Sequence, residues 1–337
     1  MPLEPILAAF VPAPTLPDDL DVPVLRVREE SNADTMVEQV AERGPDVAQK
    51  RIVYVPVAGG TIALAIYRPA LDETLPVHIY FHGGGWVAGS GLSPFTDIVA
   101  RERCVGAHCV TVAVDYRKAP EHPHPIPLDD CQGALQWVVD HAAEIGVDPS
   151  IITVGGASAG ANLAAALCLK NRDESGPAIT FQLLEVPALD LTLSLPSHAD
   201  TELGSMYALH RSDVERLLPL YLGENGDPRH PHVSPLFAGN HAGLPPAYLM
   251  PAEYDLLRDD ATAYAEKLNE AGVPAILSLQ RGHIHISGGL TKILPAARAW
   301  RDEALAVLRA VHSGHLRDLV SGSAFRRLAA ATSTDQE

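Results

Sequence analysis

Residues 151–170 read IITVGGASAGANLAAALCLK, and this stretch decides the fold class. A short β-rich run, Ile151–Val154, leads into the pentapeptide Gly156–Gly160, which has the spacing Gly-x-Ser-x-Gly. The residues that follow, Ala161–Lys170, are mostly strong helix formers. A strand, a tight turn that carries a serine and a helix, in that order, are the context of a nucleophile elbow.

The glycines of this turn have a physical purpose. Ser158 must adopt a strained backbone conformation between strand and helix, and small residues two positions away avoid a collision there. The start of the helix presents free N–H groups to the same place. The alternative is a Gly/Ala-rich turn without catalytic meaning, and the strand before it and the helix after it favour the elbow.

From residue 51 onward, β-rich runs alternate with helical stretches, which predicts an α/β protein with a mostly parallel eight-stranded sheet flanked by helices. The expected strands are Arg51–Val57, Ile62–Tyr67, Val77–Phe81, Cys109–Val114, Ile151–Val154, Phe181–Val186, Ala247–Met250 and Ala275–Leu279. The expected helices lie at about 35–42, 95–104, 129–145, 160–171, 212–221, 260–271 and 292–311.

Two parts of the chain interrupt this alternation. Residues 192–240 are far longer than the about 2–6 residues of an ordinary loop between helix and strand. Residues 1–50 are rich in proline and then in charge. We interpret both segments as a helical cap over the carboxyl edge of a main domain at 51–312, and residues 313–337 as a weakly packed C-terminal tail.

A second glycine motif, His82-Gly83-Gly84-Gly85-Trp86, follows the strand expected at 77–81. Loops of this HGGG type supply N–H groups to an oxygen anion, and such donors must be fixed about 2.7–3.1 Å from that oxygen. The candidate donors are the N–H groups of Gly83, Gly84 and Ala159, and His82 is expected to orient the loop. A phosphate-binding loop is the alternative, but the helix that such a loop opens is missing here.

A serine hydroxyl is a poor nucleophile at neutral pH and needs a base that an acid orients. After an elbow serine, the acid comes next in the chain and the histidine last. Two histidines, His283 and His285, follow the last expected strand, and alternate residues of an extended chain face the same way. Spacing alone therefore does not choose between them.

Four acidic residues follow the strand expected at 247–250, and each is a candidate for the acid: Glu253, Asp255, Asp259 and Asp260. Asp259 and Asp260 also suit the capping and charging of a helix start. The pair His283-x-His285 resembles a metal pair, but no third ligand stands beside it at a zinc spacing.

The formal net charge of −17 argues against nucleic acid or an anionic membrane as a partner. The four cysteines form no Cys-x-x-Cys pair, so we expect them to be reduced and mostly buried in a cytoplasmic protein. The first 19 residues carry five prolines and no basic start, unlike a signal peptide, and no apolar run predicts a membrane span. A homodimer is left open.

Taken together, the motifs resemble those of the hormone-sensitive-lipase-like family of α/β-hydrolases, the bacterial type IV esterases, over about residues 35–312. In that family the acid is the first Asp of a D-x-L-R-D-like stretch, which falls on Asp255, and the base lies thirty residues later, on His285. The segment 181–187 with Asp190 also resembles the bacterial heroin (acetyl) esterases. The motifs that carry the family resemblance are His82–Gly85, Asp115–Glu121, Gly156–Gly160, Asp255–Asp259 and His285.

The resemblance implies the α/β-hydrolase fold with a helical cap, no cofactor, and hydrolysis of small-molecule carboxylic esters with short or medium acyl chains. It implies Ser158 as nucleophile, His285 as base and Asp255 as acid, with an acyl-enzyme intermediate. Trp86 would border the site. The same groups also suit an amidase or a lactonase, and a non-catalytic ligand-binding member of the fold is the alternative outside enzymes.

Two positions depart from the family pattern. Ala157 stands before the serine where the family usually has Asp, and Ile286-Ser287 follows the base where the family usually has Gly-Phe. Neither change removes a member of the triad. We expect them to alter the rate or the substrate range.

The sequence predicts a reaction without a metal, because no ligand set at zinc spacing is present. Treatment with EDTA should leave the rate of ester hydrolysis unchanged. Loss of all activity, restored by added zinc, would show that this prediction is wrong.

Overall fold

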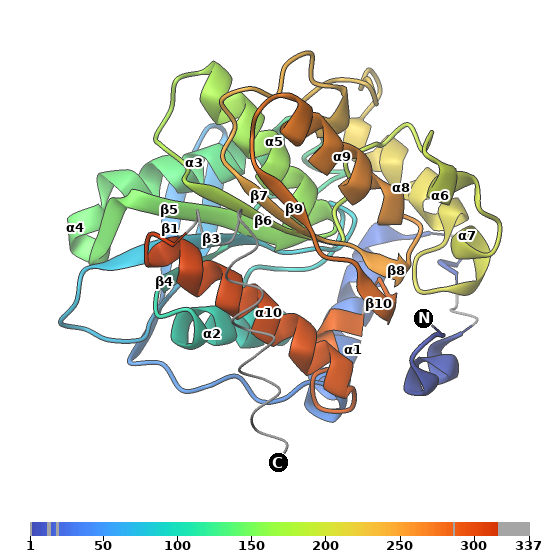
Figure 1. Cartoon of the computed structure of the whole chain (residues 1–337), viewed down its shortest axis with the longest axis horizontal. Coiled ribbons are helices and arrows are strands. Elements are labelled where there is room, and N and C mark those ends of the chain that lie inside the picture. The colour runs from blue at the N-terminus through green and yellow to red at the C-terminus, as the bar shows by residue number, and fades with distance from the viewer. Residues whose placement is uncertain (1, 12–14, 18–19, 286, 316–337) are drawn as a thin grey trace.

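An eight-stranded sheet runs through the chain, as Figure 1 shows for the computed structural model, which describes residues 2–11, 15–17, 20–285 and 287–315. The strand order is β1-β2-β4-β3-β5-β6-β7-β9. Only β2 runs against its neighbours, so the predicted mostly parallel sheet is confirmed. The strands are β1 (Gln49–Val57), β2 (Gly60–Arg68), β3 (Leu75–Phe81), β4 (Val110–Asp115), β5 (Val147–Ala157), β6 (Phe181–Glu185), β7 (Ala247–Met250) and β9 (Ala275–Leu277).

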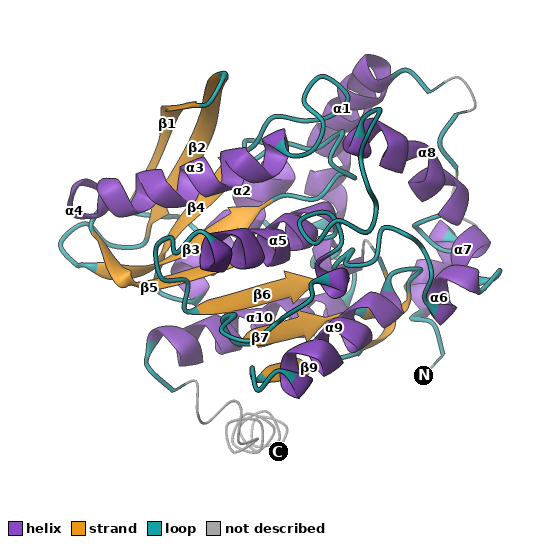
Figure 2. Cartoon of the chain, turned by 90° about the horizontal axis from the view of Figure 1, so that it is seen from above, coloured by secondary structure: helices purple, strands orange, loops and turns teal. Residues whose placement is uncertain are grey.

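Helices cover both faces of the sheet (Figures 1 and 2). One face carries α2 (Pro94–Gly106) and α10 (Pro295–His312). The opposite face carries α3 (Ile126–Asp140), α5 (Ala159–Asp173) and α9 (Arg258–Glu270). The short α4 (Ala142–Ile145) leads into β5.

Several further elements lie in the two segments that interrupt the alternation. Residues 192–240 hold α6 (Pro196–Ala199), α7 (Leu203–Met206), α8 (Arg211–Leu222) and a 3-10 turn at Pro235–Phe237. The first 50 residues hold a 3-10 turn at Pro5–Phe10 and helix α1 (Val22–Val40). A further 3-10 turn spans Ser287–Gly289.

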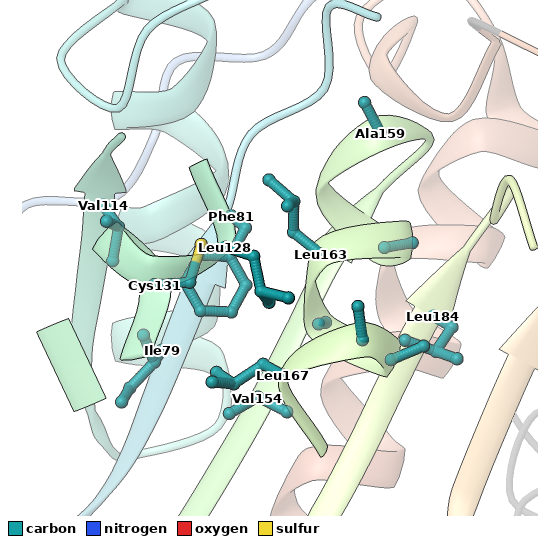
Figure 3. Packing of buried hydrophobic residues seen from close by; sticks show 14 of the residues in the cluster. Ile79, Phe81, Val114, Leu128, Cys131, Val154, Ala159, Leu163, Leu167 and Leu184 are labelled. Carbon is teal, nitrogen blue, oxygen red and sulfur yellow. The ribbon is translucent and has the colours of Figure 1, made fainter. Parts of the chain in front are cut away.

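The largest hydrophobic cluster holds α5 against the middle of the sheet (Figure 3). Leu163 and Leu167 stand one turn apart on α5, and both are fully buried near Phe81 of β3 and Val154 of β5. Because α5 begins at the residue after Ser158, this packing also fixes the position of the serine.

The structure contains a small second sheet that the sequence did not predict. Strands β8 (Ala252–Tyr254) and β10 (Gln280–Ile284) pair in parallel, with Tyr254 opposite Ile284. The strand expected at 275–279 ends at Leu277, and the chain then turns into β10. Runs as short as these carry too little periodicity to be recognised in a sequence.

Helix α1 was expected at 35–42 but spans 22–40, so this prediction was wrong about where the helix begins. The start is marked by Asp21, whose side chain accepts the N–H of Val24 at 3.1 Å, and by Pro23 in the first turn. This signal was missed because the helix has little amphipathic pattern. Of the tail expected at 313–337, residues 316–337 lie outside the described part of the chain.

All four cysteines are free and buried. In the described part of the chain, none of the helices has the length and apolar character that a membrane crossing requires.

Candidate active site

The turn at Ser158 is an elbow with a strained backbone. Ser158 has φ 56° and ψ −120°, a backbone conformation that residues other than glycine rarely adopt. Its N–H donates to the carbonyl of Glu185 at 2.9 Å. A Cβ added to Gly156 or to Gly160 would collide with the carbonyl oxygen of Phe81. Only glycine therefore lets β5, α5 and the end of β3 approach this closely.

Ser158, His285 and Asp255 form one hydrogen-bonded chain. The Nε2 atom of His285 lies 2.9 Å from the Oγ atom of Ser158, and its Nδ1 atom lies 2.8 Å from Oδ2 of Asp255. Asp255 is buried, and its second oxygen accepts the N–H of Leu257 at 3.0 Å. The three groups predicted as a triad are thus brought together in the order that nucleophilic catalysis needs.

The second sheet places two members of this chain. Tyr254 of β8 is aligned with Ile284 of β10, and Asp255 and His285 are the next residues of the two strands. Parallel neighbouring strands lie about 4.7–4.9 Å apart, so their carboxyl ends deliver both side chains to one place. The thirty-residue spacing between Asp255 and His285 therefore reflects the pairing of β8 with β10.

The glycine loop after β3 lies against the elbow because Phe81 is the register partner of Gly156. A Cβ added to Gly83 would stand 3.6 Å from the Cβ of Ser158. Among the described residues, the N–H groups of Gly83, Gly84 and Ala159 donate to no other group of the chain. These three N–H groups therefore stay candidates for stabilising an oxygen anion.

His82 holds the loop in this orientation. Its ring is buried and stacks on Tyr116 with a centroid distance of 4.2 Å. Burial, assisted by Lys118, lowers the pKa of His82 to about 4, so the ring is neutral near pH 7. Its Nδ1 lies 2.7 Å from the carbonyl oxygen of Gly83 and must carry the proton of that bond. Since C=O and N–H of one peptide unit point in opposite directions, this bond also orients the N–H of Gly84.

Trp86 is buried against α8. Its ring stacks on Tyr221 of α8 with centroids 4.5 Å apart, and its Nε1–H donates to Oδ1 of Asn162 at 3.2 Å. The expectation that Trp86 borders the site stays a prediction.

Comparison with known proteins identifies the family of the chain. A family model described as alpha/beta hydrolase fold matches residues 78–287, which include every residue of the candidate triad and of the glycine loop. The chain belongs to the hormone-sensitive-lipase-like α/β-hydrolases. It is a serine ester hydrolase, as its relatives are.

Three similar proteins are esterases. The carboxylesterase NlhH of Mycobacterium tuberculosis is 37% identical over 315 residues, covering 92% of this chain and 96% of its own. A hyperthermophilic esterase from Pyrobaculum calidifontis has a TM-score of 0.84 at 33% identity, covering 92% of this chain and 99% of its own. Bacterial heroin esterase has a TM-score of 0.83 at 33% identity, covering 92% of this chain and 98% of its own.

In this esterase the other histidine of the loop, His283, does not reach the serine. It is buried, and its Nδ1 bonds to Oγ of Ser287 at 2.7 Å while its ring lies edge-on to Trp300. Burial lowers the pKa of His283 to about 4. Ser287 also accepts the N–H of Ile284 at 3.1 Å, so this departure from the family pattern helps to secure the end of β10. Ile286 lies outside the described residues.

The other acidic candidates are engaged elsewhere. Glu253 accepts the N–H of Gly282 at 2.7 Å, and Asp259 accepts the N–H of Ser197 at 2.9 Å. Asp260 is fully buried, with its Oδ2 2.7 Å from Nε2 of His198. Neither Asp259 nor Asp260 caps α9, so the prediction of a capping role was wrong, although both lie in its first turn. The N-cap position is taken by Leu257, and the two carboxylates bind the segment at 189–197 instead.

Asn162 was not singled out from the sequence, although it lies close to the site. It stands four residues after Ser158 on α5, and its N–H donates to the carbonyl of that serine at 3.0 Å. A polar residue one helical turn after an elbow serine, inside an otherwise apolar stretch, was the available signal. Within the described residues, no three His, Cys, Asp or Glu side chains gather closely enough to hold a metal ion.

The two histidines should differ sharply when each is replaced by alanine. His285→Ala removes the only ring that contacts both Ser158 and Asp255 in the described structure, so turnover should fall by several orders of magnitude. His283→Ala removes a buried bond to Ser287, so it should lower thermal stability but change kcat by less than about tenfold, or ~1.4 kcal/mol of barrier. Asp255→Asn should follow His285→Ala in direction. An inactive His283→Ala beside an active His285→Ala would contradict this assignment.

Proposed function

We propose that this esterase hydrolyses carboxylic esters through an acyl-enzyme intermediate on Ser158. The observation that supports this most directly is the position of His285, whose two ring nitrogens lie 2.9 Å from the serine and 2.8 Å from the carboxylate of Asp255. A base held from behind by an acid can take the proton of the hydroxyl in the correct tautomer. The related carboxylesterase NlhH and the Pyrobaculum calidifontis esterase are both named for ester hydrolysis, which agrees with this chemistry.

In the first half of the reaction, Oγ of Ser158 attacks the carbonyl carbon of the ester while Nε2 of His285 takes its proton. The carbonyl oxygen becomes an anion, and the N–H groups of Gly83, Gly84 and Ala159 stabilise it. His285 then gives the proton to the leaving alcohol, which departs. Water repeats the sequence on the acyl-enzyme and releases the acid, so protons and bonds balance over one cycle.

We also propose that residues 1–50 and 192–240 form one cap on the domain at 51–312. Support comes from Asp213 of α8, whose Oδ1 accepts the N–H of Leu16 at 3.1 Å, and from Arg216, whose Nη1 donates to the carbonyl of Leu16 at 3.1 Å. Leu217 of the same helix lies directly over Gly85 of the glycine loop. A cap in contact with the glycine loop restricts the space for the acyl group, which favours short or medium acyl chains. The name of the related bacterial heroin esterase agrees with a small-molecule substrate.

Arg26 of α1 forms several hydrogen bonds to the domain at 51–312. Its Nε donates to the carbonyl of Val87 at 2.6 Å, at the end of the glycine loop, and its Nη2 donates to the carbonyl of Ala119 at 2.6 Å. The same guanidinium forms a two-pronged ion pair with Glu121, at 2.8 and 2.7 Å. Bidentate pairs of this kind have fixed geometry, so Arg26 sets the angle at which α1 meets the loop.

We infer a cytoplasmic location from the four free, buried cysteines, which suit a reducing compartment. The homodimer considered from the sequence stays a prediction, which sedimentation of the purified chain would test.

A fluorophosphonate should label Ser158 alone, and mass spectrometry should find the adduct on the peptide that contains residues 156–160. Ser158→Ala should lose both the label and several orders of magnitude in rate, because loss of one triad member removes the concerted chemistry. An ester with a chromogenic alcohol should release a burst equal to the enzyme concentration in the wild-type protein. A label on another serine, or turnover that survives in Ser158→Ala, would contradict the proposed function.

The cap proposal predicts a loss of stability and of substrate affinity when the Arg26 link is cut. Arg26→Ala should lower the free energy of unfolding by about 1–3 kcal/mol, as expected for lost hydrogen bonds to charged groups. It should also raise KM several-fold, because α1 no longer closes over the loop. Arg43→Ala is the control: it removes the solvent-exposed pair with Asp46 in the same segment and should change neither quantity measurably. Identical KM and unfolding curves for Arg26→Ala and the wild type would refute the link.

A further inference from the structure

The amide of Asn162 joins four parts of the molecule at one buried point. Its Nδ2 donates to the carbonyl of Ala188, after β6, and to the carbonyl of Val233, in the segment at 192–240, both at 2.8 Å. Its Oδ1 accepts the indole N–H of Trp86 at 3.2 Å. Its own backbone lies in the first turn of α5, bonded to Ser158.

The orientation of this amide is forced by its partners. Two carbonyl oxygens need donors, and only the NH₂ group of the side chain supplies them, so the oxygen must face the indole N–H, which only donates. Asn162 is fully buried and uses both of its N–H donors and its oxygen. A buried polar group with every bond made is rigid, and a change that removes it leaves three partners unpaired.

Trp86 needs such an anchor because its backbone is strained. It has φ 62°, in the left-handed region that a tryptophan rarely adopts, and it follows Gly84 and Gly85, which also have positive φ. Strained residues persist only where their surroundings hold them. Here the carbonyl of Trp86 accepts the N–H of Ala119 at 3.0 Å, and the indole is held by Asn162 and by the stack on Tyr221.

We propose that Asn162 is a positioning residue that fixes the glycine loop relative to the nucleophile, and thereby sets the distance from the N–H groups of Gly83 and Gly84 to the developing oxyanion. The inference rests on the proposed function of these N–H groups. Asn162 lies on α5, the helix that starts directly after the serine. The same helix therefore fixes the positions of both the nucleophile and the glycine loop. Asn162 touches neither the base nor the acid, and it acts through Trp86 on the stabilisation of the transition state.

Asn162→Leu is the direct test, because leucine has the same number of side-chain heavy atoms in the same branched arrangement and makes none of the three hydrogen bonds. The kcat for each active site, counted by burst titration, should fall by about 10–100-fold, which is less than the about 10²–10³-fold known for loss of a whole oxyanion donor. KM should stay within about twofold. The acidic limb of the pH profile, which reports the base, should not move, since His285 and Asp255 keep their contacts.

A substrate pair separates this role from a general structural one. Sulfur accepts hydrogen bonds poorly, so the wild-type enzyme should prefer an ester to the matching thionoester, in which sulfur replaces the carbonyl oxygen. If Asn162→Leu displaces the oxyanion donors, that preference should shrink by about the same factor as kcat. A fall in kcat with an unchanged preference would mean that the nucleophile or the base was disturbed, and would overturn the proposal. An unchanged kcat would overturn it as well.

Two further variants complete the design. Asn171→Leu is the matched control, because Asn171 is also buried on α5 and donates to a loop carbonyl, that of Pro177, at 2.7 Å, but at the far end of the helix. It should lower stability and leave kcat and the preference unchanged. Trp86→Phe keeps an aromatic ring, although a smaller one, and removes the indole N–H, and should lower kcat by about threefold to tenfold, as expected for one hydrogen bond.

If Asn162→Leu fails to fold, Trp86→Phe decides the question: an unchanged kcat and preference would overturn the proposal. In the double variant, the fold-decrease in kcat should be smaller than the product of the two single fold-decreases, because both substitutions break the same hydrogen bond. Failure of this inference is distinct from failure of the proposed function. In the first case Ser158 is still labelled and Ser158→Ala is inactive, whereas in the second case these two results themselves are absent.

Discussion

His285 reaches both Ser158 and Asp255 only because β10 lies beside β8. This pairing involves very few residues, yet it turns a separation of thirty positions in the chain into a hydrogen bond of 2.8 Å. The main sheet positions Ser158 and the glycine loop, while the small sheet positions Asp255 and His285, the proposed acid and base, at the ends of its two strands. The chemistry is therefore assembled where two sheets meet, and the packing of each sheet has to be correct before any of the groups can act together.

The main sheet makes its own contribution through close backbone approach. Phe81 ends β3 opposite Gly156, and its carbonyl oxygen lies where a side chain at Gly156 or Gly160 would have to be. The elbow is thus sharp because three backbone segments share one small volume. The same close approach brings Gly83 next to Ser158, so a single steric constraint places both the proposed nucleophile and the loop that carries its proposed oxyanion donors.

The sequence predicts those parts of the site that lie within one motif or one strand. The elbow, the glycine loop and all eight strands of the main sheet follow from local patterns, because each is encoded in consecutive residues. The choice of Asp255 and His285 needed the family resemblance, since the pairing of β8 with β10 leaves no periodic signal. The position of Asn162 one helical turn after the serine was a sequence signal, but its partners could not be predicted, because Trp86, Ala188 and Val233 are remote in the chain and two of them bond through backbone carbonyls.

The burial of the four cysteines lowers their reactivity towards electrophilic reagents. A thiol reacts as the thiolate, and burial raises the pKa of Cys109 to about 12 and those of the other three above their usual value as well. At neutral pH almost no thiolate exists, and solvent does not reach the sulfur atoms. Reagents that attack thiolates should therefore modify these four cysteines slowly while the protein is folded.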